Sequence, residues 1–243
     1  MIIVTGHLGF IGSHFVKRLH PSSYIGIDRK EGNDILMMEV FPQSKKEEIN
    51  IVYHFAAQTS VIDSVADPIE DARNNILSTI RIAKAYPKAR IIYTGSGGAS
   101  EQKSIESPYG LSKKVAGEYL KLLHNDYVIC NLPNVFGPRG KGVVEKFLED
   151  EVLNIYGDGG QTRDFVHVSD IVDGLVRASD WLKGEYFFGS GRAVRILELV
   201  KAVGKSWNQC QARNGELYTT HVDNTTPNWK PVIDVLQYLM LNK

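Results

Sequence analysis

The chain opens with the stretch Met1–Ser13, MIIVTGHLGFIGS, in which a short apolar run leads into glycines at positions 6, 9 and 12. A strand that enters a glycine-rich turn and then a helix lets backbone amides approach a pyrophosphate, and the helix N-terminus directs its partial positive charge at that phosphate. The spacing is G-x-x-G-x-x-G rather than G-x-G-x-x-G, so the motif alone indicates a dinucleotide site only weakly. An ordinary glycine-containing turn is the alternative.

A second apolar run, Tyr24–Ile27, follows a predicted helix over Phe10–Leu19 and ends at Asp28. An acidic residue at this point binds the ribose 2′-hydroxyl and repels a 2′-phosphate, which favours NAD over NADP. Asp28 is otherwise a solvated turn residue. The neighbouring Arg29 keeps NADP open, because a guanidinium can pair with a 2′-phosphate.

Composition narrows the class of protein. The chain has 243 residues, 43% of them hydrophobic, a formal net charge of zero and two cysteines. A neutral chain without a basic run does not predict a nucleic-acid partner. No apolar run approaches the ~18 residues of a membrane span, and the start does not resemble a signal peptide. Two cysteines without metal-ligand spacing suit a reducing compartment and predict no metal site. We expect a cytoplasmic protein.

Apolar strand-like runs alternate with helical patterns through the first half of the chain. The runs are Ile2–Val4, Tyr24–Ile27, Ile51–Phe55, Arg90–Tyr93 and Tyr127–Asn131, and helices are predicted over Asp67–Tyr86 and Ser107–His124. This alternation predicts an α/β fold, a Rossmann-type doubly wound parallel sheet with helices on both faces. Ligands of such sheets bind at the carboxyl ends of the strands.

After Asn131 the composition of the sequence changes. Residues Asn134–Gly142 and Gly157–Thr162 are rich in Gly, Pro, Asn and Asp and are expected to be loops, with a strand at Val152–Tyr156 between them. Ser169 is the predicted N-cap of a helix that runs to Trp181, and shorter helices are expected at Arg195–Val203 and Ile233–Leu241. We therefore expect an NAD-binding domain over residues 1–132 and a small substrate lobe over 133–243, interleaved with the first around 163–181.

A tyrosine and a lysine share one face at the start of a predicted helix. Tyr109 and Lys113 are four residues apart, and a nearby ammonium would lower the tyrosine pKa toward working pH. Such a pair is usually no more than a solvated helix face. Here the strand Arg90–Tyr93 also ends in the Gly-rich run Thr94–Gly98, whose Ser96 is placed to hydrogen-bond a reacting hydroxyl.

In this order, the motifs resemble the extended short-chain dehydrogenases, specifically the NAD-dependent epimerase/dehydratase (nucleotide-sugar epimerase) family. The matching pieces run over nearly the whole chain: TGHLGFIGS, Asp28, HFAAQ at 54–58, Asn74, TGS at 94–96, YGLSK at 109–113, NVFGPR at 134–139, GDGGQTRDFVHV at 157–168, GSG at 189–191 and WKP at 229–231.

The resemblance implies roles for individual residues. The catalytic set maps to Ser96, Tyr109 and Lys113. The cofactor-binding set maps to Gly6, Gly9, Phe10, Ile11, Gly12, Asp28, Asp34, Ile35, Phe55, Ala56, Ala57, Asn74 and Thr94, together with Tyr109 and Lys113. On the substrate side, Ser96, Asn134, Arg163 and Arg213 match residues that hold the sugar and the diphosphate, for which arginine is suited by its planar fork.

Other polar residues are expected to be structural. His54 and His167 are predicted to be hydrogen-bonded at strand ends, and Cys130 to lie in the core. Asn131 stands where the family often has arginine, and the contracted segments after Ser96 and between Asp223 and Pro231 shrink the predicted substrate lobe.

The absence of two residue pairs that other branches of the family use narrows the expected reaction. Dehydratases of this family carry an Asp-Glu pair where Gly97 and Gly98 stand, and the 3,5-epimerase/reductase branch uses a Cys and a His that are not matched here. The resemblance then implies a nucleotide-sugar epimerase, most simply a 4-epimerase acting through a 4-keto intermediate, with a UDP-sugar favoured. The alternatives are an NAD(P)-dependent reductase or dehydrogenase of a nucleotide sugar and a non-catalytic NAD-binding regulator. Family members pair through helices matching Asp67–Tyr86 and Ser107–His124, so a homodimer is expected.

Overall fold

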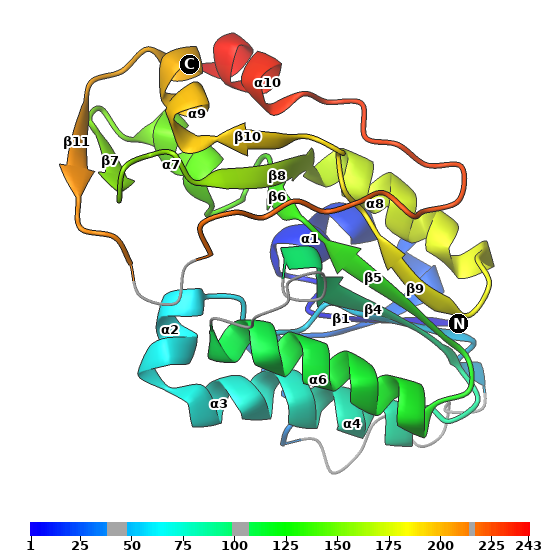
Figure 1. Cartoon of the computed structure of the whole chain (residues 1–243). Coiled ribbons are helices and arrows are strands. Elements are labelled where there is room, and N and C mark those ends of the chain that lie inside the picture. Colours follow the sequence, from blue (N-terminus) through cyan, green and yellow to red (C-terminus); the bar gives the residue numbers. More distant parts are fainter. Residues whose placement is uncertain (38–47, 99–106, 214–216) are drawn as a thin grey trace.

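The computed structural model describes residues 1–37, 48–98, 107–213 and 217–243. Its main sheet has six described strands, all parallel, in the order β2-β1-β3-β4-β5-β9 (Figure 1). They are β1 (Ile2–Thr5), β2 (Tyr24–Ile27), β3 (Ile51–His54), β4 (Arg90–Ser96), β5 (Tyr127–Leu132) and β9 (Gly184–Phe187). The expected doubly wound parallel α/β sheet is confirmed, and its carboxyl edge gathers Thr5, His54 and Ser96.

Helices cover both faces of this sheet because its buried side chains alternate with a period of two. Ile3 and Ile91 pack with Ile82 and Leu120 from the helices α4 (Ser78–Ala85) and α6 (Pro108–Leu123). Val4 and Ile92 lie in a second cluster with residues of α1 (Phe10–Phe15) and α8 (Val168–Arg177). Figure 1 shows α3, α4 and α6 on one side of the sheet and α1 and α8 on the other.

The second half of the chain forms a smaller body with its own core. Two sheets, β10-β8-β6 and β11-β7, pack with three helices around Phe136, Leu153 and Leu199. The elements are β6 (Asn134–Phe136), α7 (Val143–Glu149), β7 (Leu153–Tyr156), β8 (Thr162–His167), β10 (Ala193–Arg195), α9 (Ile196–Val203), β11 (Trp207–Cys210) and α10 (Val235–Asn242). Between β8 and β10 the chain returns to the main sheet to build α8 and β9. The domain boundary at residue 132 stays a prediction.

Three local expectations were wrong. Asn134–Phe136 is a strand rather than a loop, because it pairs with residues 165–167 of β8. The N-cap of α8 is His167, whose ring accepts from the Ser169 N–H, rather than Ser169 itself. The first helix ends at Phe15 and continues as a 3-10 turn over Val16–Arg18, short of Leu19.

The predicted helix Asp67–Tyr86 is built from three pieces. Asp67 caps the helix α3 (Pro68–Ala72) by accepting from Glu70 N at 3.0 Å. The π-helical turn η5 (Arg73–Leu77) follows, and α4 then continues to Ala85. Such turns interrupt the regular α-helical ladder and frequently mark functional sites. The turn η5 contains two asparagines, Asn74 and Asn75. A short helix α2 (Val61–Ala66) precedes this stretch.

None of the helices in the described part of the chain has the length and apolar character needed to cross a bilayer.

Candidate active site

The glycine loop between β1 and α1 is packed so tightly that two of its glycines have no room for a side chain. Gly6 adopts φ +68°, and a Cβ there would lie 2.7 Å from Ala56 N. A Cβ on Gly12 would collide with the Gly6 carbonyl oxygen and lie 2.8 Å from His7 Cα. Gly6 N donates to Ile27 O at 2.8 Å, and Gly9 N donates to Gly6 O at 2.9 Å. The loop is thus held close against the strand ends, as close approach to a pyrophosphate requires.

Asp28 joins this loop to the end of β2. Its carboxylate accepts from Leu8 N and from Lys30 N, both at 3.0 Å. A carboxylate has about four acceptor sites, so these two bonds orient it and leave capacity for ribose hydroxyls. Arg29 points away toward α3, where its Nη1 lies 4.0 Å from the Glu70 carboxylate. This arrangement fits a ribose with a free 2′-hydroxyl.

Two cations that sequence reasoning left without a role lie beside the loop. Lys30 Nζ and Arg139 Nη2 donate to the Leu8 carbonyl oxygen at 3.4 and 3.3 Å. Arg139 reaches it from the turn after β6 with φ 73°, which few non-glycine residues adopt. The NVFGPR motif contains Arg139, but only the fold brings it to the first turn of the chain.

Some of the other predicted cofactor residues lie beside the glycine loop, whereas others lie in the core or bond to neighbouring residues. Phe55–Ala57 follow β3 beside the glycine loop, where Ala56 N donates to Thr5 Oγ1 at 3.2 Å, and Thr94 Oγ1 donates to His54 O at 3.3 Å. Ile35 is a core residue packed with the α4 and α6 side chains, whereas Asp34 Oδ1 accepts from Leu36 N at 2.8 Å. Asn74 Nδ2 donates to Glu70 O and Glu70 Oε1 at 2.8 and 2.7 Å.

The predicted catalytic trio is brought together at the carboxyl end of β4. Ser107 caps α6, which begins with Pro108 and presents Tyr109 within its first turn. The Tyr109 and Ser96 side chains are hydrogen-bonded to each other. Lys113, one turn along α6, is buried with its Nζ 4.4 Å from the centre of the Tyr93 ring. Tyr93 Oη in turn donates to Lys113 O at 3.0 Å.

Burial dominates the ionisation of the catalytic pair. It lowers the pKa of Lys113 to about 7, against an opposing effect of Asp71. It raises the pKa of Tyr109 to about 12, where the Ser96 hydrogen bond acts to lower it and Asp71 acts to raise it. The expectation that the lysine lowers the tyrosine pKa below its usual value is therefore wrong for the protein by itself. Burial is the largest influence on the pKa of Tyr109, and the Lys113 Nζ lies over the Tyr93 ring.

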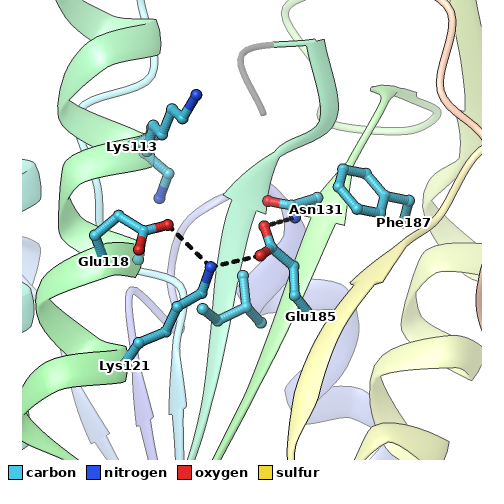
Figure 2. A pocket seen from close by; sticks show the side chains of 9 residues that line it. Lys113, Glu118, Lys121, Asn131, Glu185 and Phe187 are labelled. Atoms are coloured by element: carbon cyan, nitrogen blue, oxygen red, sulfur yellow. Dashed lines mark hydrogen bonds and ion pairs between the residues drawn. The ribbon is translucent and has the colours of Figure 1, made fainter. Parts of the chain in front are cut away.

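A pocket of about 230 Å³ opens beside Lys113, between α6 and the strands β5 and β9 (Figure 2). Lys121 bridges Glu118 and Glu185 at 2.9 and 2.6 Å, and Asn131 Nδ2 donates to Glu185 Oε1 at 2.6 Å. Asn131, which stands where the family often has arginine, therefore belongs to a polar network on the α6 side of the sheet.

The two predicted substrate arginines line one pocket of about 270 Å³ in the smaller body. Arg163 is buried, and its Nη1 donates to Thr162 O and Tyr218 O at 2.8 and 3.2 Å. The Arg213 guanidinium stacks 3.5 Å from the Tyr156 ring centre. Asn134 lies apart from them, with Nδ2 donating to Asp164 O at 3.2 Å.

Gly97 and Gly98 face the chain segment that contains Thr220 and Val222. A Cβ on Gly97 would lie 2.7 Å from Val222 Cγ2, and one on Gly98 would lie 3.2 Å from Thr220 Cγ2. Asp164 holds this segment by accepting from Val222 N at 3.4 Å. An acid pair like that of the dehydratases would need the Val222 side chain to shift and the Thr220 methyl group to give slightly.

The residues expected to be structural behave as such. His54 is buried between Thr5 Oγ1 and Thr79 Oγ1 at 2.8 and 3.1 Å, and burial lowers its pKa to about 3. His167 caps α8, and Cys130 is buried in the core, which raises its thiol pKa. In the described residues, no group of three or more His, Cys, Asp or Glu side chains is arranged to hold a metal ion.

Comparisons with known proteins agree with this geometry. The model of the NAD dependent epimerase/dehydratase family matches residues 2–187. A putative UDP-glucose 4-epimerase from Methanocaldococcus jannaschii is 33% identical, over 97% of this chain and 94% of the relative. That alignment spans 289 positions, more than the 243 residues here, so the relative carries residues without a counterpart in this chain.

A UDP-glucose 4-epimerase from Mycolicibacterium smegmatis is 32% identical over 95% of this chain and 93% of its own length. Among solved structures, the UDP-glucose 4-epimerase of Thermotoga maritima with UDP-glucose superimposes with a TM-score of 0.81 at 28% identity, covering 99% of this chain and 96% of that one. The UDP-glucuronic acid 4-epimerase of Bacillus cereus with UDP-glucuronic acid and NAD gives 0.82 at 27%, covering 99% and 97%. The chain belongs to the NAD-dependent epimerase/dehydratase family.

Proposed function

We propose that this protein is an NAD-dependent nucleotide-sugar 4-epimerase and hence an isomerase. The observation that carries the proposal is the hydrogen-bonded pair Ser96–Tyr109 with Lys113 one helical turn away, at the same sheet edge as the glycine loop. The loop and Asp28 would hold the adenosine diphosphate of NAD, and Lys113 would reach the nicotinamide ribose. Bound NAD supplies a hydride acceptor and later donor, together with a positively charged ring.

The side chains of Tyr109 and Ser96 would handle the proton of the sugar 4-hydroxyl. The positive charges of Lys113 and of the bound cofactor ring would favour the Tyr109 phenolate, which would accept the proton of the sugar 4-hydroxyl as C4 is oxidised. Ser96 would hold the same oxygen in place. The resulting 4-keto sugar turns to present its other face. Tyr109 returns its proton to the oxygen as C4 is reduced again. Atoms and electrons balance over the cycle, and no external oxidant or reductant is consumed.

For the substrate we propose a UDP-sugar. The related enzymes of Methanocaldococcus jannaschii and Mycolicibacterium smegmatis are named for UDP-glucose. Arg163 and Arg213 share one pocket and offer guanidinium groups to a diphosphate. The family resemblance implies a diphosphate contact for Asn134 too, but Asn134 lies outside this pocket, so the two arginines carry the proposal.

The test is interconversion of UDP-glucose and UDP-galactose by the NAD-loaded protein, with the Tyr109→Phe variant alongside. We expect the wild type to interconvert the two sugars without net change in NADH. The variant should lose at least about 100-fold in kcat, the usual contribution of a general acid/base, and should still bind NAD. Stoichiometric consumption of NADH would instead identify a reductase, and NAD binding without turnover of any nucleotide sugar would identify a regulator.

We further propose that the protein is a cytoplasmic homodimer. The helices α2, α3 and α6 and the turn η5 carry an exposed apolar set, namely Ile62, Val65, Ile69, Leu77, Leu111, Tyr119, Leu122 and Leu123. Large exposed apolar side chains gathered on neighbouring helices favour a protein partner. The two free cysteines, Cys130 and Cys210, suit a reducing compartment.

A further inference from the structure

The helix α3 carries a buried carboxylate that has no role in the chemistry described so far. Asp71 of α3 is 1% exposed. Its Oδ1 accepts from Asn75 Nδ2 at 3.0 Å, and its Oδ2 has no hydrogen-bond partner among the described residues. An incompletely bonded carboxylate is costly in a protein interior unless a nearby positive charge compensates it.

A hydrogen-bonded chain connects Asp71 to the catalytic helix. Asn75 Nδ2 also donates to Ser112 Oγ at 2.9 Å, and Ser112 Oγ donates to Tyr109 O at 3.0 Å. Asn75 Oδ1 accepts from Gln58 N at 2.9 Å, which ties the same network to the segment after β3. The π-helical turn η5 places Asn75 at this junction. The network thus fixes α3 against the turn of α6 that lies between Tyr109 and Lys113.

Several titratable groups surround the catalytic pair Tyr109 and Lys113, and only some of them carry a free charge. Asp71 interacts electrostatically with Tyr109 and with Lys113. The groups that face the pair or share its pocket are His54 from β3, Tyr93 from β4, Lys114, Glu118 and Lys121 from α6, and Glu185 from β9. His54 stays neutral because burial lowers its pKa to about 3, and Lys121 already pairs with Glu118 and Glu185.

We propose that Asp71 is a positioning residue for catalysis, the buried counter-charge that keeps Lys113 an ammonium and, through Asn75 and Ser112, holds Tyr109 in place. Burial raises the pKa of Asp71, whereas Ser112 and Lys113 lower it. Its negative charge raises the pKa of both Lys113 and Tyr109. Without it, the lysine would lose its proton at lower pH, and the tyrosine would ionise at lower pH as well.

The test compares Asp71→Asn with wild type as the NAD-loaded protein, and it rests on the proposed epimerase activity. Both limbs of the pH profile of kcat/KM should move to lower pH in the variant, by roughly one pH unit, the lower end of the effect of a nearby charge. Asp71→Glu keeps the charge and should keep the limbs in place. The control Asp63→Asn removes an exposed carboxylate on α2 and should leave the profile unchanged.

A second measurement does not depend on turnover. Lys113 lines the pocket beside α6, and competitive acetylation followed by mass spectrometry reports its titration midpoint. We expect a midpoint near pH 7 in wild type and roughly one unit lower in Asp71→Asn. If Asp71→Asn does not fold, Asp71→Ser carries the same expectation.

An unchanged midpoint and unchanged limbs in a folded neutral variant would overturn the proposal. So would failure of both neutral variants to fold while Asp71→Glu folds, since this would assign the carboxylate to stability. Failure of the proposed function has a different signature, because the wild type itself would then interconvert no sugar while the acetylation midpoints remained measurable.

Discussion

At the scale of single residues, burial decides what each titratable group does. Lys113 and His54 are both basic side chains enclosed near the same sheet edge, and burial lowers the pKa of each, to about 7 and about 3. Lys113 therefore retains charge near neutral pH, whereas His54 remains a neutral hydrogen-bonding group. Sequence spacing identified Tyr109 and Lys113 as a pair, but the distance of Nζ from the Tyr93 ring had to come from the fold.

His54 makes the stability of the protein depend on pH in the acid range. In the unfolded chain the histidine binds a proton below about pH 6.5, and in the folded protein only below about pH 3. The unfolded state thus binds more protons between these values, and stability falls as the pH falls. From pH 7 to 5 this group should account for a loss on the order of 2 kcal/mol.

Urea unfolding at pH 7 and pH 5 checks this expectation. The His54→Asn variant should lose less stability between the two pH values than wild type, although it is less stable at pH 7. The exposed His20 supplies the control, since His20→Asn should keep the wild-type dependence on pH. Equal pH dependence in His54→Asn and wild type would contradict the assignment.

At the scale of elements, the β1–α1 turn can form only because Gly6 and Gly12 lack side chains, which lets neighbouring backbone segments pack in direct contact. The Gly12 backbone leaves no space for a Cβ next to the Gly6 carbonyl, and neither group can move as a flexible side chain would. The π-helical turn η5 is the second such element, since it places Asn75 between Asp71 and Ser112. The periodicity of Asp67–Tyr86 predicted a helix but contained no signal for this turn.

Gly12→Ala should therefore open the turn and weaken NAD binding by at least about tenfold, or 1.4 kcal/mol. Isothermal titration with NAD measures the change. Gly117→Ala in α6 is the matched control, because its Cβ would meet Ile129 Cδ1 at an ordinary 3.6 Å. A helical alanine should leave NAD affinity unchanged and add about 0.5–1 kcal/mol of stability. Wild-type affinity in Gly12→Ala would refute this account of the loop.

At the scale of the whole molecule, the outer side of the helices α3 and α6 exposes large apolar side chains. Leu122 on α6 and Ile69 on α3 are 82% and 74% exposed, and Figure 1 shows both helices on the same outer side of the sheet. The opposite face is covered by α8, which packs against α1. The proposed dimer surface thus includes the outer face of α6, the helix that also carries Tyr109 and Lys113.

The double variant Ile69→Glu/Leu122→Glu should convert the proposed dimer into a monomer of 27.1 kDa, because charge on a buried apolar surface is costly. Sedimentation equilibrium measures the mass. Leu182→Glu alters a leucine that is equally exposed, at 82%, in the turn before β9 and should leave the dimer intact. A wild type that sediments as a monomer would rule the proposal out.

The spacing of residues along single strands and helices was enough to predict much of the fold. The strand–glycine–helix start, Asp28 at the end of the second strand and the four-residue step from Tyr109 to Lys113 are set by strand and helix periods, which act over a few residues. The sequence by itself was therefore enough to predict the parallel sheet, and its motifs, through the family they resemble, supplied the hypotheses of an NAD site and of the catalytic trio.

The tertiary structure decided what meets across the chain. It brought Val222 against Gly97 and Arg139 to the glycine loop, and it placed Asp71 where its charge acts on Lys113, although these residues are far apart in sequence. It also made Asn134–Phe136 a strand, because β8 supplies its partner. These outcomes depend on burial and pairing between distant segments, and no local pattern encodes the desolvation that sets the charge of a buried group.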